Sequence, residues 1–308
     1  MRFLHLALSL NFAAGSLAAA LHAEQKRTTV CNGFAELCDR SYGNITFFGS
    51  HDSYTADTDP LDLASTQRIN LTAQLDLGVR FLQAEAHNNS DGELHFCHTS
   101  CLLFDGGTVE DYLSTVNTWM RQNPTEVVSF LFTNDDNLSL TTQWNPAFEA
   151  SGILDLVYVP PNPPVARSDW PTLGELIGNN TRILVFMDSF ANTTILPYIL
   201  REFDMIWEPP FDSTNSSFPC SINRITGPLS AADHMYLLNH NLDIDLFDTG
   251  ILIPDPEQAE TTNSAASILA DAAGCTPLGG GVSPNFILLD FVDVGEGLQV
   301  ANQLNGLC

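Results

Sequence analysis

The sequence has very few basic residues. Among its 308 residues, 11 are Lys or Arg and 37 are Asp or Glu, which gives a formal net charge of −26, and the only lysine is Lys26. A surface this acidic repels phosphate backbones at neutral pH, so we expect no nucleic acid partner and no strong attraction to anionic membranes. The charge suits either an acidic external habitat, in which carboxylates protonate, or simply the solubility of a secreted protein.

Long apolar runs are also missing after residue 23. No such run approaches the ~20 residues that a membrane helix needs, so we expect no transmembrane segment and at most transient contact with a membrane surface. The short, Ala-rich apolar segment that follows Arg2 has the form of a signal peptide, expected over residues 1–23, with possible further processing after Arg27. The sequence therefore predicts a secreted, extracellular protein whose folded part spans residues 28–308.

No Gly/Ser-rich or charged linker divides the remaining chain, which predicts one domain, expected to be a monomer. Seven cysteines fit an oxidising compartment. Their spacing favours the pairs Cys31/Cys38, Cys97/Cys101 and Cys220/Cys275, and leaves Cys308 over, although sequence alone leaves other pairings open. Seven Asn-x-Ser/Thr sequons predict a glycoprotein: Asn44, Asn70, Asn88, Asn137, Asn179, Asn192 and Asn215.

Short apolar runs rich in β-branched and aromatic residues recur along the chain and predict eight strands. They are Ile45–Phe48, Val79–Ala84, Leu94–Cys97, Val127–Thr133, Ile183–Met187, Met205–Trp207, Met235–Leu238 and Phe286–Asp290. Several are apolar on both faces, as buried parallel strands are. Helical patterns between them, notably over 66–77 and 109–122, indicate β/α alternation. The expected fold is a single (β/α)8 TIM-type barrel, α/β in class and irregular in its C-terminal half, after Phe211.

Polar residues at the ends of these runs are the informative ones, because catalytic groups of such barrels lie at the carboxyl ends of the strands. His51 and Asp52 follow the first run, His98 follows the third, and Asp290 ends the last. A pair of imidazoles can deprotonate a nucleophile and protonate a leaving group, since an ordinary pKa of ~6.5 makes both states accessible. The pattern predicts an enzyme with His51 and His98 at its centre.

Three stretches carry a resemblance to a known family, in the same order and with similar spacing: FFGSHDSYT, LDLGVRFLQAEAH and LHFCHTSC. They resemble the catalytic segments of the phosphatidylinositol-specific phospholipase C-like phosphodiesterases, and in particular their secreted fungal branch. The resemblance covers nearly the whole mature chain. It implies a phosphoric diester hydrolase or lyase in which one histidine acts as base and the other as acid. Carried over, His51 is the base and His98 the acid.

The supporting residues follow from the same comparison. We expect Asp290, with Asp52 as the next candidate, to orient one imidazole and to stabilise its charged form. Bacterial lipases of the family place an arginine on the second strand, whereas this chain has Gln83 and Glu85 there. A carboxylate would repel the phosphate unless a cation lay between them. Glu85 and Asp52 are therefore candidate ligands of Ca²⁺ or Mg²⁺, and Gln83 could add an oxygen.

Other residues are weaker candidates for contact with substrate or metal. Gln83, Trp207 and His240 are candidate substrate contacts, although Trp207 is equally explained by core packing and His240 is structural by default. Asp188 is an alternative ligand for metal or substrate. His87 could be a metal ligand.

Two further residues are expected to be structural. His95 lies within the third run and is more often structural in such a position. Arg80 is expected to form a buried ion pair at the floor of the barrel. We expect neither of them at the phosphate.

The expected substrate is a phospholipid or a glycerophosphodiester-like molecule, and the strong negative charge disfavours anionic inositol lipids. Two alternatives stay open at this point. The barrel could be an inactive extracellular binding protein, or it could be a glycerophosphodiester phosphodiesterase with a firm metal site.

Overall fold

The computed structural model describes residues 30–57 and 63–307. The expected signal peptide, the processing site after Arg27 and Cys308 lie outside the described residues. The strands are β1 (Phe47–Ser50), β2 (Phe81–Asn88), β3 (Leu94–His98), β4 (Phe104–Thr108), β5 (Val128–Thr133), β6 (Ile183–Met187), β7 (Ile199–Arg201), β8 (Ile206–Trp207), β9 (Met235–Asn239), β10 (Asp243–Asp245), β11 (Leu252–Pro254) and β12 (Phe286–Leu289). The α-helices are α1 (Leu71–Leu77), α2 (Val109–Gln122), α3 (Asn145–Ala150), α4 (Leu173–Gly178), α5 (Ala259–Thr262), α6 (Ala265–Cys275) and α7 (Gly297–Leu304).

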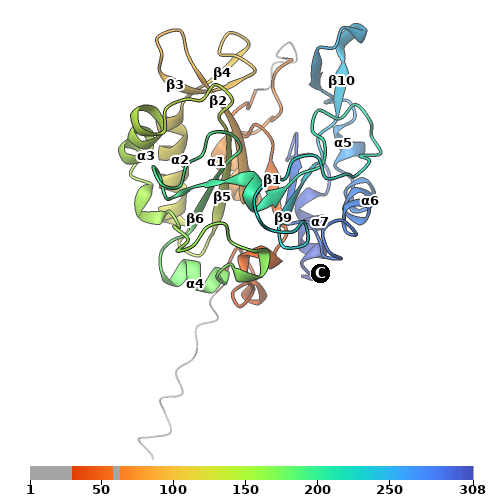
Figure 1. Cartoon of the computed structure of the whole chain (residues 1–308). Helices are drawn as coiled ribbons and strands as arrows, with labels where there is room; N and C mark the ends of the chain where they lie inside the picture. The colour runs from red at the N-terminus through yellow and green to blue at the C-terminus, as the bar shows by residue number, and fades with distance from the viewer. Residues whose placement is uncertain (1–29, 58–62, 308) are drawn as a thin grey trace, which may run out of the picture.

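Eight strands form one parallel sheet, in the order β7-β6-β5-β2-β1-β12-β9-β8. The sheet curls and carries helices on its outside (Figure 1). Among the described residues no hydrogen-bonded ladder joins β7 to β8, so the structure has a curled, barrel-like sheet and a closed eight-stranded barrel is not confirmed. The α/β class is as expected from the sequence.

Two strands differ from the expected set. β3 is not a strand of the barrel, because it pairs antiparallel with β2 and with β4 and so forms a β2-β3-β4 extension at one end of the sheet. The connection between β2 and β3 covers 89–93, too short for a crossover to a parallel neighbour. The place left in the barrel is taken by β7, three residues long, which the sequence pattern did not indicate.

Helices cover the sheet unevenly. α2 has the expected bounds, whereas α1 begins at Leu71, because the Asn70 side chain accepts a hydrogen bond from the Ala73 N–H and caps the helix there. The segment just before it has another use: Thr66 and Gln67 donate side-chain hydrogen bonds to the carbonyl oxygen of His51. Between β6 and β9 the described chain has no α-helix, which agrees with the irregular C-terminal half.

Alternation along the strands divides the core into an inner and an outer part. Phe81 and Phe286 face the inside of the curled sheet, where their ring centroids lie 4.1 Å apart, and Leu82 and Ile287 face the helices. Packed aromatic rings therefore fill the lower part of the barrel. Because of the same alternation, every second residue near the carboxyl end of each strand also points to the inside of the sheet. Side chains of several strands can therefore meet at this end and form a site.

The three expected disulfides are present: Cys31–Cys38, Cys97–Cys101 and Cys220–Cys275. All seven sequon asparagines are exposed, and their glycosylation stays a prediction. Within the described ranges, no helix has both the length and the apolar character needed to cross a bilayer.

Candidate active site

Two sharp turns place the two candidate catalytic histidines. His51 follows β1 and His98 ends β3, and the residue after each of them has a left-handed backbone, with φ 38° at Asp52 and φ 59° at Thr99. Such values are strained for residues other than glycine and cluster at functional sites. The Gln83 side chain holds one turn by accepting the Asp52 N–H at 2.7 Å, and Glu85 holds the other by accepting the Thr99 N–H at 2.8 Å.

His51 forms a dyad with a buried carboxylate. Its Nδ1 lies 2.8 Å from Oδ1 of Asp290, the residue that follows β12 next to β1 in the sheet. An Nδ1–H that donates to this carboxylate leaves Nε2 as the free acceptor. Nε2 lies 3.7 Å from Oδ2 of Asp52. The ring is thus oriented with its basic nitrogen toward the cleft, as a general base requires.

His98 lies next to the same carboxylate. Its Nδ1 lies 2.6 Å from the carbonyl oxygen of Ala64, and its Nε2 lies 3.5 Å from Oδ2 of Asp52. Asp52 is therefore placed between the Nε2 atoms of both imidazoles, where it can stabilise a proton on either of them. Four candidate catalytic residues from three separate segments meet at one point.

Electrostatics favours the charged form of His51. Burial lowers its pKa, but the negative charges of Asp52 and Asp290 and the hydrogen bond to Asp290 outweigh burial and raise the pKa to about 10. Burial raises the pKa of Asp52 above its ordinary value, although both imidazoles act in the opposite direction. The dyad is therefore built to stabilise an imidazolium at His51.

Glu85 lies on the inner face of β2, next to these groups. Burial raises its pKa, but hydrogen bonds from His87 and from the Thr99 N–H outweigh burial, so that the pKa of this carboxyl lies below its ordinary range. Glu85, Asp52 and His98 each offer a ligand atom, and these atoms lie within 4.8 Å of one another. Two carboxylates and one imidazole suit a divalent cation, and the carboxylate oxygens suit Ca²⁺ or Mg²⁺. Gln83 lines the cleft, but its carbonyl already accepts the Asp52 N–H.

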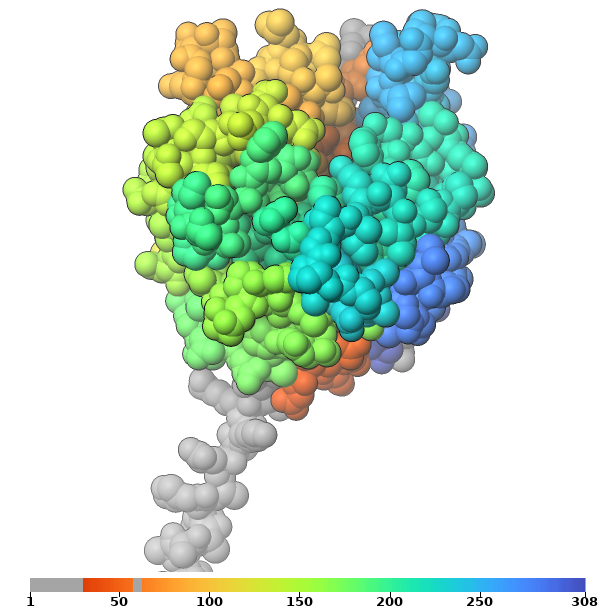
Figure 2. Space-filling model, viewed as in Figure 1, coloured from red at the N-terminus to blue at the C-terminus, as the bar shows by residue number. Residues whose placement is uncertain are grey.

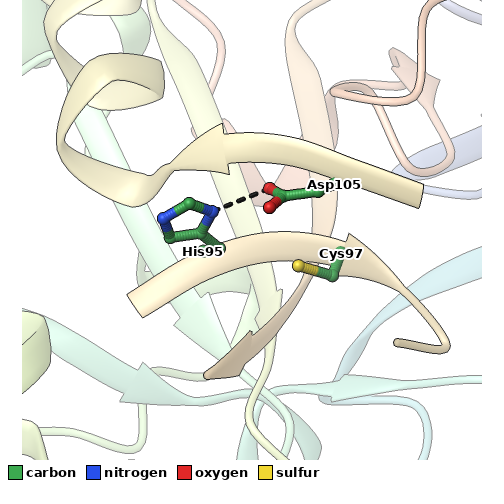
Figure 3. A group of neighbouring side chains, drawn as sticks. All are labelled: His95, Cys97 and Asp105. Atoms are coloured by element: carbon green, nitrogen blue, oxygen red, sulfur yellow. Dashed lines mark hydrogen bonds and ion pairs between the residues drawn. The ribbon is translucent and has the colours of Figure 1, made fainter. Parts of the chain in front are cut away.

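A second group of potential ligands is structural. His95, Cys97 and Asp105 lie close together on β3 and β4 (Figure 3). The sulfur of Cys97 is bonded to Cys101, and His95 Nδ1 lies 2.7 Å from Asp105 Oδ1. An oxidised sulfur is not a thiolate ligand, so this group stabilises the hairpin that carries His98.

Three of the four candidate catalytic residues, His51, Asp52 and His98, line a cleft of about 1030 Å³. Its other lining carboxylates are Asp135, Asp188, Glu202, Glu208, Asp212 and Asp243. Burial, as the main cause, raises the pKa of Asp188 to about 6 and that of Asp243 to about 7. Burial also raises the pKa of Glu202 well above its ordinary value, and the neighbouring Glu208 adds to this shift.

One arginine lines this acidic cleft. Arg224, from the long connection between β8 and β9, forms an ion pair with Glu208 and lies over the rings of Phe203 and Phe211, with its guanidinium carbon 5.0 and 4.3 Å from their centroids. Sequence reasoning missed it, because its segment has neither a strand nor a helix pattern. The cleft therefore contains a guanidinium, although none lies on β2.

Two expected substrate contacts do not lie at the cleft. Trp207 is fully buried and stacks on Tyr236 at a centroid distance of 4.7 Å. His240 is also fully buried, with Nδ1 2.8 Å from Oδ2 of Asp271 and Nε2 2.9 Å from the Thr262 carbonyl. Neither residue lines the cleft, because both side chains are used inside the protein, so the structure does not bring these two candidates to the site.

The remaining candidate residues lie partly in the cleft and partly outside it. Asp188 does line the cleft. His87 bridges Glu85 and Asp136, which gives it a supporting place behind Glu85. Arg80 pairs with Glu126 at 2.8 Å, the structural ion pair that was expected.

Comparison with known proteins identifies the family. The family description PI-PLC X 1 matches residues 37–305. The chain belongs to the PI-PLC X domain family. A relative from Arthroderma benhamiae, "PI-PLC X domain-containing protein 1", is 43% identical over 283 residues and covers 90% of each chain. A second protein of that fungus, "Uncharacterized secreted protein", is 41% identical over 292 residues, which are 91% of this chain and 65% of that protein.

Solved structures of bacterial proteins share the fold. A mutant of phosphatidylinositol-specific phospholipase C from Staphylococcus aureus superposes with a TM-score of 0.56 at 14% identity, over 82% of this chain and 88% of that one. The phosphatidylinositol-specific phospholipase C from Listeria monocytogenes gives a TM-score of 0.50 at 15% identity, over 87% and 94%. At 14% and 15% identity, this similarity shows that the chain shares the fold of these bacterial proteins. It gives no information on activity or substrate.

Proposed function

We propose that this family member cleaves phosphoric diesters, with His51 as general base and His98 as general acid. The observation that carries the proposal is the arrangement around Asp52, in which the Nε2 atoms of both histidines lie 3.7 and 3.5 Å from Oδ2 of one buried carboxylate. Two imidazoles next to one carboxylate suit cleavage of a phosphodiester, which needs one proton removed from the attacking hydroxyl and one delivered to the leaving oxygen.

The dyad explains how His51 works. Nε2 takes the proton from the attacking hydroxyl, which comes from the substrate or from water, and the resulting imidazolium is the state that Asp290 and Asp52 stabilise. His51 can act as a base only while its imidazole is neutral. It must therefore first release the proton that Asp290 and Asp52 stabilise on the ring. His98, fixed through Nδ1 by the Ala64 carbonyl, delivers a proton from Nε2 to the leaving oxygen.

A divalent cation fits the residues beside the histidines. Asp52 and Glu85 would hold it through carboxylate oxygens, and it would supply the positive charge that the phosphate needs in a cleft lined by carboxylates. His98 lies within the same set of ligand atoms, so the cation and a protonated His98 would compete for this place. Arg224 is the other source of positive charge in the cleft.

The same family membership supports a membrane lipid or a glycerophosphodiester-like molecule as the substrate and secretion as the destination. The acidic lining disfavours headgroups with additional negative charge, so we propose an uncharged or zwitterionic headgroup. Secretion is supported by the similarity to the "Uncharacterized secreted protein" and by three disulfides, which form in oxidising compartments.

The test is turnover of a soluble chromogenic phosphodiester across pH 4 to 10, with Ca²⁺, Mg²⁺ or EDTA. We expect His51→Ala and His98→Ala each to lower kcat by a factor on the order of 100 or more, the usual contribution of one acid or base. Asp91→Ala, which removes an exposed side chain from the connection between β2 and β3, outside the cleft, is the control and should keep its activity. Wild-type activity in both histidine variants, or no turnover under any condition, would contradict the proposal.

EDTA distinguishes the metal-dependent alternative. A glycerophosphodiester phosphodiesterase with a firm metal site would lose turnover in EDTA and regain it with added cation. Full activity in EDTA would exclude the cation at Asp52 and Glu85 and leave Arg224 and the imidazoliums as the positive charges at the phosphate.

A further inference from the structure

The hairpin of β3 and β4 carries His98 and projects beyond the body of the molecule, as Figure 2 shows in orange and yellow. Tyr54, from the turn after β1, packs against both strands of this hairpin. Its ring stacks on Phe96 of β3 with the ring centroids 5.6 Å apart, and it meets Phe104 of β4 edge to face at 6.2 Å. A Cβ at Gly106 would lie 2.5 Å from Cδ2 of Tyr54, so the backbone of β4 approaches the ring because this residue is glycine. One side chain from the segment of the proposed base therefore anchors the hairpin of the proposed acid.

The hydroxyl of Tyr54 is buried and has no hydrogen-bond partner among the residues that the structure describes. Within the same described residues, Oδ1 of Asp52 is also buried without a partner, whereas Oδ2 lies near both imidazoles. Burial raises the pKa of Tyr54 well above its ordinary value, and the nearby charge of Asp52 is the next cause, so the hydroxyl stays protonated and remains a donor. Buried polar atoms without partners are rare because they cost free energy. A donor and an acceptor that both lack a partner are therefore neighbours here.

The side chain of Asp52 needs such a partner more than its backbone does. Three hydrogen bonds fix the backbone: the N–H donates to Oε1 of Gln83, and the carbonyl accepts from the hydroxyls of Thr55 and Thr66. None of these bonds acts on the carboxylate, whose rotation decides whether Oδ2 lies near the two imidazoles. A hydrogen bond to Oδ1 would fix this rotation, because a carboxylate held at one oxygen cannot turn the other one away.

We propose that the Tyr54 hydroxyl donates a hydrogen bond to Oδ1 of Asp52 and that Tyr54 is a positioning residue for the proposed reaction. Its hydroxyl fixes the carboxylate that serves both histidines, and its ring fixes the hairpin that carries one of them. Tyr54 does not line the cleft, so it acts through Asp52 and not on the substrate. The inference rests on the proposed function in so far as its readout is turnover.

The first variant is Tyr54→Phe, which removes the hydroxyl and leaves the ring against the hairpin. We expect kcat for the soluble diester to fall by a factor on the order of 10, because a hydrogen bond to a charged group is lost, whereas KM should change less than twofold. The matched control is Tyr42→Phe. Tyr42 is another buried tyrosine outside the cleft, with its hydroxyl 2.6 Å from that of Ser129. This control also loses one buried hydroxyl and should keep kcat within twofold of wild type.

A double-mutant cycle shows whether Tyr54 acts through Asp52. Asp52→Ala and the double variant Tyr54→Phe/Asp52→Ala should have the same kcat, because without the carboxylate the hydroxyl has nothing to position. Losses that multiply in the double variant would overturn the proposal, and so would a wild-type kcat in Tyr54→Phe.

Unfolding of the same four proteins separates this hydrogen bond from the proposed reaction. Their urea unfolding midpoints, measured with the disulfides intact, should also be non-additive, because the two groups stabilise each other whether or not the chain turns over a diester. Non-additive unfolding without turnover by wild type would refute the proposed reaction and establish the hydrogen bond. Additive midpoints would overturn the hydrogen bond itself.

Discussion

Asp243 connects the acidity of the cleft to the stability of the fold. The perturbation is Asp243→Asn, which keeps the size of the side chain and removes its charge. The residue is 9% exposed, and burial together with the charge of Asp290 raises its pKa from 3.8 to about 7. A carboxyl whose pKa is raised by folding stabilises the fold while it is protonated, below pH ~4, and this contribution is lost as pH rises through about 7.

The magnitude follows from the two pKa values. They differ by about 3, and each pKa unit corresponds to 1.36 kcal/mol, so ionisation of Asp243 costs up to about 4 kcal/mol between pH 4 and pH 8. The Asn variant should match wild type at pH 4 and exceed its free energy of unfolding by up to about 4 kcal/mol at pH 8.

The assay is urea unfolding at pH 4, 5, 6, 7 and 8, followed by tryptophan fluorescence with the disulfides intact. Asp39→Asn is the matched control, because it removes a carboxylate from an exposed position away from the cleft. It should not change the pH dependence. Parallel pH profiles for wild type and Asp243→Asn, or an Asn variant that is less stable at pH 8, would refute the reasoning.

The remaining predictions concern the reaction. Asp290→Asn should lower kcat/KM at least tenfold in the diester assay, because a buried hydrogen bond to a charged group contributes about 1.5–3 kcal/mol; equal activity would contradict the dyad. Glu85→Gln should remove any difference between turnover in EDTA and in Ca²⁺; a response as large as that of wild type would exclude Glu85 as a ligand. Replacing Cys97 and Cys101 together by Ser should lower kcat by a larger factor than KM changes, since the disulfide fixes the His98 turn; unchanged kcat would show that the turn holds without it.

Local patterns predicted much of the fold. Seven of the expected strands lie in the parallel sheet with small shifts at their ends, because buried apolar runs with β-branched residues are recognisable without tertiary information. The three disulfides are the pairs that spacing favoured, although spacing alone left other pairings open. The grouping of His51, Asp52, His98 and Asp290 was predictable because each of them follows or ends an apolar run.

What sequence did not predict depends on long-range packing. β3 has the composition of a barrel strand, and only its short connection to β2 indicates a hairpin, a signal that was available and missed. β7 is too short to stand out from its surroundings. Trp207 was a candidate substrate contact with core packing as the alternative, and its position after Met205 and Ile206 does not tell which face of the strand the ring occupies. Arg224 reaches the cleft from an irregular segment, where no periodicity exists to read.

The hairpin that carries His98 divides the site between two parts of the structure. His51 and Asp290 directly follow two adjacent strands of the parallel sheet, whereas His98 lies in a projecting hairpin that is closed by a disulfide between Cys97 and Cys101. In a reducing compartment the barrel could fold with its base in place while the acid lost its covalent support. If the proposed reaction is correct, a complete site would then form only together with oxidation of the chain.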